Sequence, residues 1–207
     1  MKILHISDTH GRHEELTNLP NADIVVHSGD FCFSGAESEV LNFLNWFIAL
    51  PYKHKIFIAG NHDDCLWDGN IEGLPDNCHF LRYSSITING IKFHGIPMFM
   101  HDCITDINIK GIAKIPVDTD VLITHNPPIN ILDFDDNIHY GSPELLTKVN
   151  EINPQFHLFG HIHASNGEIT IGATKFVNSA IVSEDYSSLQ DYHILQIRSE
   201  EHTSELQ

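Results

Sequence analysis

The segment KIFIAGNHD, residues 55–63, joins a short apolar run directly to a group of polar side chains. The run at 55–59 predicts a buried strand, and Gly60 ends it just before Asn61, His62 and Asp63. Four other apolar runs in the chain end in the same way, in residue types that bind metals. These segments are Asp8-Thr9-His10, Gly29-Asp30, Thr124-His125-Asn126-Pro127-Pro128 and Gly160-His161-Ile162-His163. Because strand ends in a parallel sheet share one edge, the five segments are predicted to meet there.

Strand and helix patterns alternate in the first 60 residues and return after residue 120. Strands that end at the five segments are predicted at residues 2–7, 23–26, 55–59, 121–124 and 156–159. Helical spacing of apolar residues predicts helices at residues 14–19 and 37–50. Ser142-Pro143 marks the start of another helix, because serine is a common N-cap and proline is common in the first turn.

The remaining segments have a different character. Residues 85–95 predict a hairpin that turns at Asn89-Gly90, and residues 97–116 predict a long excursion over one face. Alternating patterns at residues 168–171, 174–178 and 191–197 predict antiparallel strands. Together the patterns predict an α/β fold with two sheets, formed by one domain at residues 1–197.

The chain has 207 residues and a net charge of −17, from 28 acidic and 11 basic residues. This charge disfavours nucleic-acid polymers and anionic membranes as partners. For the same reason it disfavours a nuclease that acts on DNA or RNA. A phosphate substrate would be repelled unless bound cations reverse the local charge. The four cysteines form no CxxC pair, and no signal-peptide pattern opens the chain, so we expect reduced thiols and a cytoplasmic location.

The polar segments supply oxygen and imidazole ligands suited to two divalent metal ions. Imidazoles favour Mn, Fe or Zn, and the absence of cysteine disfavours a structural zinc site. Asp30 follows a glycine and is suited to a carboxylate shared by both ions. The predicted ligands are Asp8, His10, Asp30, Asn61, His125, His161 and His163. Two such ions would support hydrolysis of a phosphate ester.

His62 and Asp63 are the predicted catalytic residues. His62 is surplus to the ligand set and can stabilise the transition state or protonate the leaving oxygen. Asp63 could orient His62 by accepting a ring proton. Asn61, His62, Gly141 and Ser142 are predicted to contact the substrate, because the helix that begins near Ser142 offers free N–H groups to an anion.

The five segments resemble, in order, the DxH, GD, GNH[DE], H and GHxH pattern of the calcineurin-like metallophosphoesterase superfamily. The resemblance spans Asp8 to His163. It implies a four-layer αββα sandwich with two mixed β-sheets and a dinuclear metal site. We expect manganese in this site, with iron or zinc as the alternatives. The resemblance also implies one metal held by Asp8, His10, Asp30 and His163, and another held by Asp30, Asn61, His125 and His161.

A closer resemblance covers nearly the whole chain. The segments HSGDF at 27–31, HNPP at 125–128 and HLFGHIH at 157–163 are similar to the metallophosphoesterase-domain-containing subfamily. That subfamily implies hydrolysis of small phosphodiesters, including cyclic nucleotides. The alternative is a nucleotide-binding regulatory protein of low turnover that uses the same metal site. Neither reading predicts an oligomeric state.

The final ten residues, RSEEHTSELQ at 198–207, break the strand alternation that ends at Ile197. Translation of a widely used short-read sequencing adapter in one frame gives the same string. We therefore interpret residues 198–207 as an artefact tail on the domain formed by residues 1–197.

Truncation after Ile197 is expected to leave the melting temperature and the kinetic constants unchanged within error. The tail carries four charged residues and one apolar residue, so it has little to bury. Thermal denaturation and hydrolysis assays on both chain lengths test this expectation. A clear fall in melting temperature on truncation would show that the tail packs on the domain.

Overall fold

The structure is a computed structural model that describes residues 1–67, 69–100 and 108–197. Cys103 and the proposed artefact tail at 198–207 lie outside these residues. Among the described residues, no helix is both long and apolar enough to cross a membrane.

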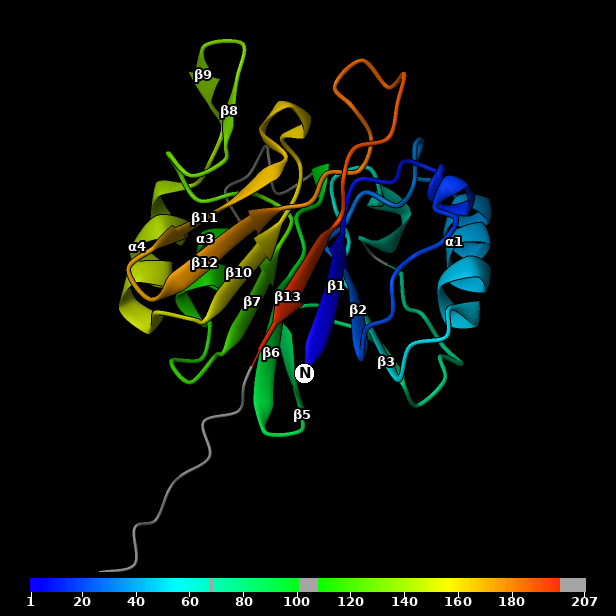
Figure 1. The fold of residues 1–207 in the computed structure, drawn as a ribbon, viewed down its shortest axis with the longest axis horizontal. Coiled ribbons are helices and arrows are strands. Elements are labelled where there is room, and N and C mark those ends of the chain that lie inside the picture. Colours follow the sequence, from blue (N-terminus) through cyan, green and yellow to red (C-terminus); the bar gives the residue numbers. More distant parts are fainter. Residues whose placement is uncertain (68, 101–107, 198–207) are drawn as a thin grey trace, which may run out of the picture.

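Two large mixed β-sheets form the centre of the molecule (Figure 1). In the first sheet, β1 to β4 are parallel and β13 pairs with β1 in the antiparallel direction. The order across this sheet is β13 (His193–Gln196), β1 (Lys2–Ile6), β2 (Ile24–His27), β3 (His54–Phe57) and β4 (Cys78–Phe80).

The second sheet has four parallel strands, with one antiparallel strand at each edge. Its order is β11 (Gly167–Ile171), β12 (Thr174–Asn178), β10 (Phe156–Phe159), β7 (Val121–Thr124), β6 (Ile91–Ile96) and β5 (Ser84–Ile88). A small hairpin of β8 (Phe134–Asp135) and β9 (Ile138–His139) projects from the same end of the molecule as the loop that follows β12 (Figure 1).

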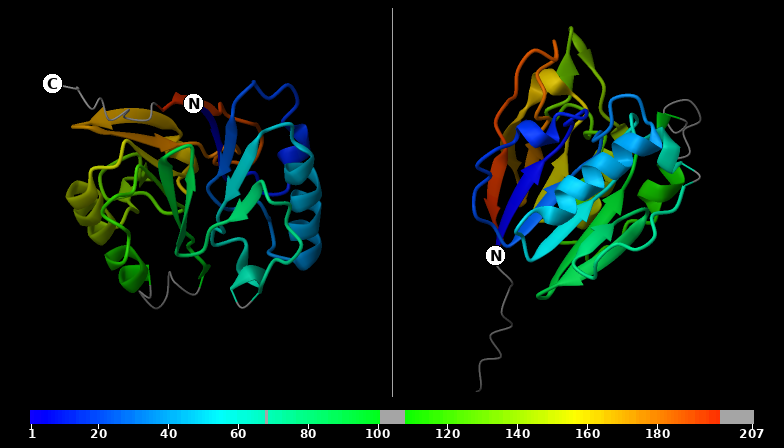
Figure 2. Two further views of the ribbon diagram at one scale, coloured as in Figure 1. Left: turned by 90° about the horizontal axis from the view of Figure 1, so that it is seen from below. Right: turned by 90° about the vertical axis from the view of Figure 1, so that its right-hand side faces the viewer.

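Helices cover the outer faces of both sheets, which completes the predicted αββα sandwich (Figure 2). α1 (Glu37–Ala49) lies on the first sheet, while α3 (Asn108–Ala113) and α4 (Pro143–Ile152) lie on the second. Three 3₁₀ turns, η1 (His13–Glu15), η2 (Asp64–Leu66) and η3 (His163–Ser165), follow strand ends.

Three apolar clusters hold the layers together. One lies between the sheets and includes Ile3, Ile56 and Leu158, all fully buried. Another joins α1 to the first sheet, and a third joins α3 and α4 to the second sheet. This division into three interfaces is what a four-layer sandwich requires, since each sheet must bury both faces.

The predicted hairpin at Asn89-Gly90 is confirmed, since β5 and β6 pair with Ile88 opposite Ile91. The predicted helix at 14–19 is wrong, because only the 3₁₀ turn at His13–Glu15 forms. Asn18 adopts a left-handed conformation with φ of 61°, which a right-handed helix excludes. The excursion at 97–116 contains α3, which its weak periodicity did not reveal.

Phe43→Ala is expected to lower the free energy of unfolding by about 3–5 kcal/mol, the usual cost of emptying a large aromatic site in a core. Phe43 is fully buried on α1 and stacks on Phe31 with ring centroids 4.1 Å apart. Leu41→Ala, on the same helix but 62% exposed, is the matched control and should change stability by less than about 0.5 kcal/mol. Urea denaturation measures both values, and equal losses would contradict the packing described.

Candidate metal centre

Every predicted metal ligand lies just beyond the carboxyl end of a parallel strand. Asp8 and His10 follow β1, and Asp30 follows β2. The strands β3, β7 and β10 deliver the rest, namely Asn61, His125, His161 and His163. The site therefore lies where the ends of both sheets converge, as the sequence predicted.

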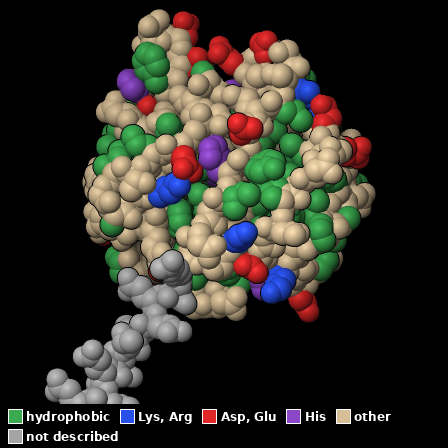
Figure 3. All heavy atoms as spheres, in the orientation of Figure 1, with side chains coloured by type: hydrophobic (Ala, Val, Ile, Leu, Met, Phe, Trp, Pro, Cys, Tyr) green, Lys and Arg blue, Asp and Glu red, His purple; other side chains and the backbone are tan. Residues whose placement is uncertain are grey.

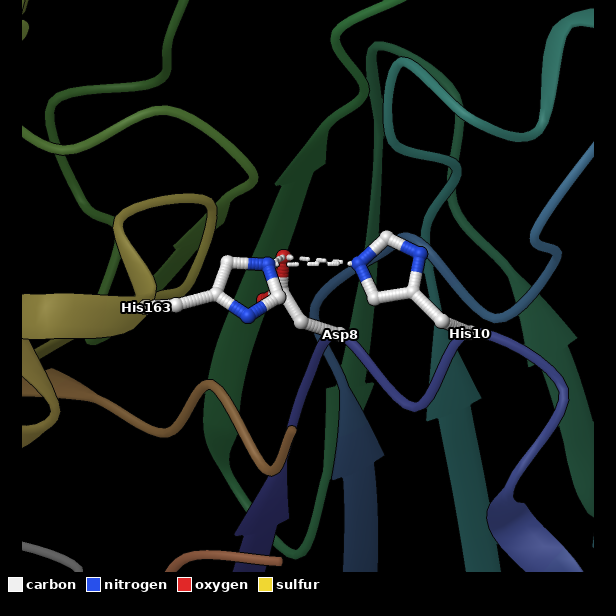
Figure 4. A group of neighbouring side chains, drawn as sticks. All are labelled: Asp8, His10 and His163. Carbon is white, nitrogen blue, oxygen red and sulfur yellow. Dashed lines mark hydrogen bonds and ion pairs between the residues drawn. The ribbon is translucent and has the colours of Figure 1, made fainter. Parts of the chain in front are cut away.

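The first cluster of ligand atoms combines Asp8, His10 and His163, with all three atoms within 4.8 Å of one another (Figure 4). The Nε2 atoms of His10 and His163 are 3.2 Å apart. Asp8 Oδ1 lies 3.6 Å from His163 Nε2 and 4.0 Å from His10 Nε2. Ligands about 2.1 Å from a shared metal ion are separated by about 3–4 Å, so these distances suit one ion.

The second cluster combines Asp30, His125 and His161, again within 4.8 Å. His125 Nε2 lies 3.4 Å from Asp30 Oδ2 and 3.0 Å from Asn61 Oδ1. Asp30 Oδ2 is also 3.8 Å from His10 Nε2, a member of the first cluster. The Asp30 carboxylate therefore lies between the two clusters, where a ligand shared by two ions would be.

Hydrogen bonds behind the imidazoles fix which nitrogen faces the site. The Nδ1 of His10 donates to Cys32 O at 3.1 Å, and that of His163 donates to Val182 O at 2.7 Å. A carbonyl can only accept, so each Nδ1 carries the proton and each Nε2 presents a lone pair. Two lone pairs 3.2 Å apart repel each other unless a cation lies between them. The donor set therefore fits a metal ion.

The local electrostatics also favour positive charge. Burial alone would lower the pKa of His125, but the carboxylates of Asp30 and Asp8 outweigh it and raise the value to about 10. Burial, followed by the charge of His125, lowers the pKa of His161 to about 4, so that ring is neutral. The negative charges of the two carboxylates thus favour a cation in the site, which is the electrostatic environment that a divalent ion needs.

Three glycines allow the strand ends to approach closely. A Cβ on Gly29 would lie 2.6 Å from His125 Nδ1, and Gly29 itself has φ of 103°. A Cβ on Gly60 would collide with the carboxylate of Asp30, and one on Gly160 with the carboxylate of Asp8. The glycines in the predicted segments are therefore needed to seat the ligands, as the sequence suggested for Gly29.

Asp63 has a different role from the predicted one. Its buried carboxylate accepts backbone N–H groups from Asp30, Cys32 and Gly60 at 2.8–2.9 Å. Burial and the charge of Asp30 raise its pKa to about 7. The expectation that Asp63 orients the His62 ring is therefore wrong, because the Nδ1 of that ring donates to Phe33 O at 2.7 Å instead. Asp63 instead fixes the loop that carries Asp30.

His62 is held by a backbone group. Its Nδ1 donates to Phe33 O at 2.7 Å, which leaves Nε2 free for chemistry. One ring nitrogen of His62 also lies within 4.8 Å of ligand atoms of His10 and Asp30. The structure therefore places His62 at the metal centre, and its predicted catalytic role stays a prediction.

A cavity of about 480 Å³ borders the second cluster through His125 and His161. Ser142 lies in its wall, where its Oγ accepts the Leu145 N–H at 3.1 Å as the N-cap of α4. Gly141 packs closely on another backbone segment, since a Cβ there would lie 2.5 Å from the Pro128 carbonyl. The substrate contact predicted for Ser142 thus has a cavity beside it, whereas Gly141 is required for packing.

Two aromatic residues at the first cluster were not predicted from the sequence. The ring of Tyr186 lies 5.2 Å from that of His10, and the ring of Phe33 lies 6.5 Å from it. Both residues occupy loops without periodic patterning. The carbonyls of Cys32 and Val182 were also missed, because any residue type can supply a carbonyl.

Two curated proteins are similar to this chain over most of its length. A UPF0046 protein of Caenorhabditis elegans is 35% identical over 227 residues, covering 95% of this chain and 81% of that protein. Human metallophosphoesterase domain-containing protein 1 is 32% identical, covering 89% of this chain and 67% of its own length.

Solved structures of lower identity share the fold. One crystal structure has a TM-score of 0.61 at 18% identity, covering 86% of this chain and 89% of its own. Another, described as GAP50, the anchor in the inner membrane complex of Plasmodium, has a TM-score of 0.55 at 12% identity, covering 92% and 75%. The family model for calcineurin-like phosphoesterases matches residues 1–165, which contain every ligand described above. The chain therefore belongs to the calcineurin-like phosphoesterase family, whose members are metal-dependent hydrolases of phosphoesters.

Proposed function

We propose that the protein is a phosphodiesterase that acts on small phosphodiesters, including cyclic nucleotides, with two manganese ions. The observation that carries the proposal is the cavity beside His125 and His161. Its wall is largely apolar, with Ile96, Met98 and Leu145 among its side chains. Such a wall suits an organic substituent of the phosphate, and a diester has one on each side of the phosphorus.

The charges around the site favour a diester over a monoester. A monoester phosphate carries up to two negative charges, whereas a diester carries one. The cavity wall, as far as the described residues form it, contains no Lys or Arg to offset a second charge. On the face shown in Figure 3, Lys and Arg side chains are scattered, and each lies near an acidic one. The same charge pattern supports a small substrate over a nucleic-acid polymer.

The chain's own residues would divide the work of hydrolysis. Bound divalent ions supply an activated water and offset charge on the phosphoryl oxygens. Asp8, Asp30 and the surrounding imidazoles hold those ions. His62 lies beside the ligands, and its bond to Phe33 O uses Nδ1 and not Nε2. From this position Nε2 can give a proton to the leaving oxygen.

Hydrolysis of bis-p-nitrophenyl phosphate and p-nitrophenyl phosphate with added Mn²⁺ tests the proposal. The diester should react with the higher kcat/KM, and chelation of the metal should abolish both activities. Cyclic nucleotides follow as natural candidates. Tight nucleotide binding without turnover would instead favour the regulatory protein that uses the same site.

Asp30→Asn is expected to weaken metal binding more than any other ligand substitution, by more than about 100-fold for at least one ion. The amide has no charge to offset the repulsion between two ions that share this position. Metal analysis after dialysis measures the stoichiometry. Asp133→Asn is the control, because Asp133 is a buried carboxylate that pairs with His139 away from the ligands. Two ions retained at normal affinity in Asp30→Asn would contradict the shared position.

His62→Ala is expected to keep both metals and to lower kcat by about 10²–10⁴-fold, the usual worth of an acid–base group. Metal analysis and steady-state kinetics on the same preparation give the two values. His139→Ala removes a histidine outside the ligand clusters and should change neither. Loss of a metal from His62→Ala would assign His62 to the ligand set.

A further inference from the structure

Two exposed aromatic rings stand together at the edge of the first ligand cluster. Phe33 is 58% exposed and Tyr186 is 40% exposed. They follow β2 and β12, so each sheet contributes one ring. Their centroids are 6.0 Å apart with the rings at 88°, an edge-to-face contact. Core packing does not explain this pair, since both rings face solvent.

The pair lies against the imidazoles of the site. Tyr186 is 5.2 Å from His10 and 5.4 Å from His163, measured between ring centroids. Phe33 is 6.4 Å from His62. The two rings therefore form a wall next to the atoms that would hold and process a phosphate.

Tyr186 is held in an unusual backbone conformation. Its φ is 58°, a region that bulky residues rarely adopt. Arg12 donates to its carbonyl at 2.9 Å and is itself paired with Glu15. Asp185 accepts the hydroxyl of Ser187 at 2.7 Å in the same loop. Strain of this kind persists where surrounding bonds impose it, and it is concentrated at sites that hold ligands.

Both backbone polar groups of Phe33 are hydrogen-bonded. Its N–H donates to Glu39 Oε1 at 3.1 Å, and its carbonyl accepts the Nδ1 proton of His62 at 2.7 Å. The backbone that carries this ring is thus tied to His62, and the ring itself contacts Tyr186 edge to face.

The ring pair and the cavity border different clusters. The cavity reaches His125 and His161, whereas the rings reach His10 and His163. A phosphate at the centre would therefore have one substituent toward the cavity and one toward the rings.

We propose that Phe33 and Tyr186 form a binding subsite for an aromatic or heteroaromatic ring of the substrate. This inference rests on the proposed function, since it places the substrate's phosphate at the metal centre. Rings attract one another through stacked and edge-to-face contacts, and the fixed pair offers both a face and an edge.

Two stable monoanions that differ by one ring test the subsite, namely methyl(phenyl)phosphinate and dimethylphosphinate. Calorimetry on the full chain loaded with Mn²⁺ should show tighter binding of the phenyl compound. Tyr186→Ala and Phe33→Ala should each reduce that preference by about 3- to 10-fold and leave dimethylphosphinate binding unchanged. Tyr186→Phe retains the ring and should retain the preference.

Phe134→Ala is the matched control, because Phe134 is 47% exposed and belongs neither to the cavity wall nor to the ring pair, so its loss should leave the preference intact. Tyr140→Ala tests the cavity as the alternative place for the ring. Tyr140 is 45% exposed, close to the value for Tyr186, but it lines the cavity at the second cluster. Its loss should leave the preference intact. Loss of the preference in Tyr140→Ala alone would place the ring in the cavity and overturn the proposal. Equal affinity of the unmodified protein for both phosphinates, or no binding of either, would also overturn it.

Hydrolysis of bis-p-nitrophenyl phosphate by the same preparations separates this inference from the proposed function. A ring preference that depends on Phe33 and Tyr186 in a protein without turnover would support the subsite and reject the phosphodiesterase. Turnover without such a preference would support the enzyme and reject the subsite.

Discussion

The close approach of the two sheets at their strand ends is the constraint on which the site depends. Ligands from β1 and β2 meet ligands from β7 and β10 only because glycines stand between them. At Gly29, even a methyl group would lie 2.6 Å from the ring of His125, and at Gly160 it would collide with Asp8. His125 then donates across the sheets to Ser28 O at 2.9 Å, which locks the approach. The apolar core between the sheets sets their spacing, and the glycines decide how near their ends can come.

The backbone at the centre is strained in the way this convergence demands. Asp8, His10, Asp30 and His161 all have positive φ, between 43° and 68°. Hydrogen bonds between the segments hold these conformations, including Asp8 N–H to Gly29 O at 2.9 Å and His10 N–H to Asp30 O at 3.0 Å. Four ligands in a costly conformation show that the fold stabilises the site at the expense of local backbone energy.

The sequence predicted the parts of this structure that depend on local pattern. Apolar runs that end in ligand residues located the parallel strands and the metal centre, and Asn89-Gly90 located a hairpin. It failed where contacts join distant residues. Asp63 is adjacent to His62, but amides of Asp30 and Cys32, more than 30 residues earlier, occupy its carboxylate. Tyr186 could not be placed beside His10 for the same reason, since 176 positions separate them and no periodicity marks either loop.

The buried carboxylates at the site require a compensating positive charge. The carboxylates of Asp8 and Asp30 are buried, and the ion pairs found for them among the described residues are with histidines. Hydrogen bonds to backbone carbonyls keep Nδ1 protonated in His10 and His163 and direct a lone pair of each inward. The neutral imidazoles of His10 and His163 do not balance buried carboxylates, whose desolvation is costly unless a cation accompanies them. Divalent ions supply that charge, and with it they turn a region that would repel phosphate into one that attracts it.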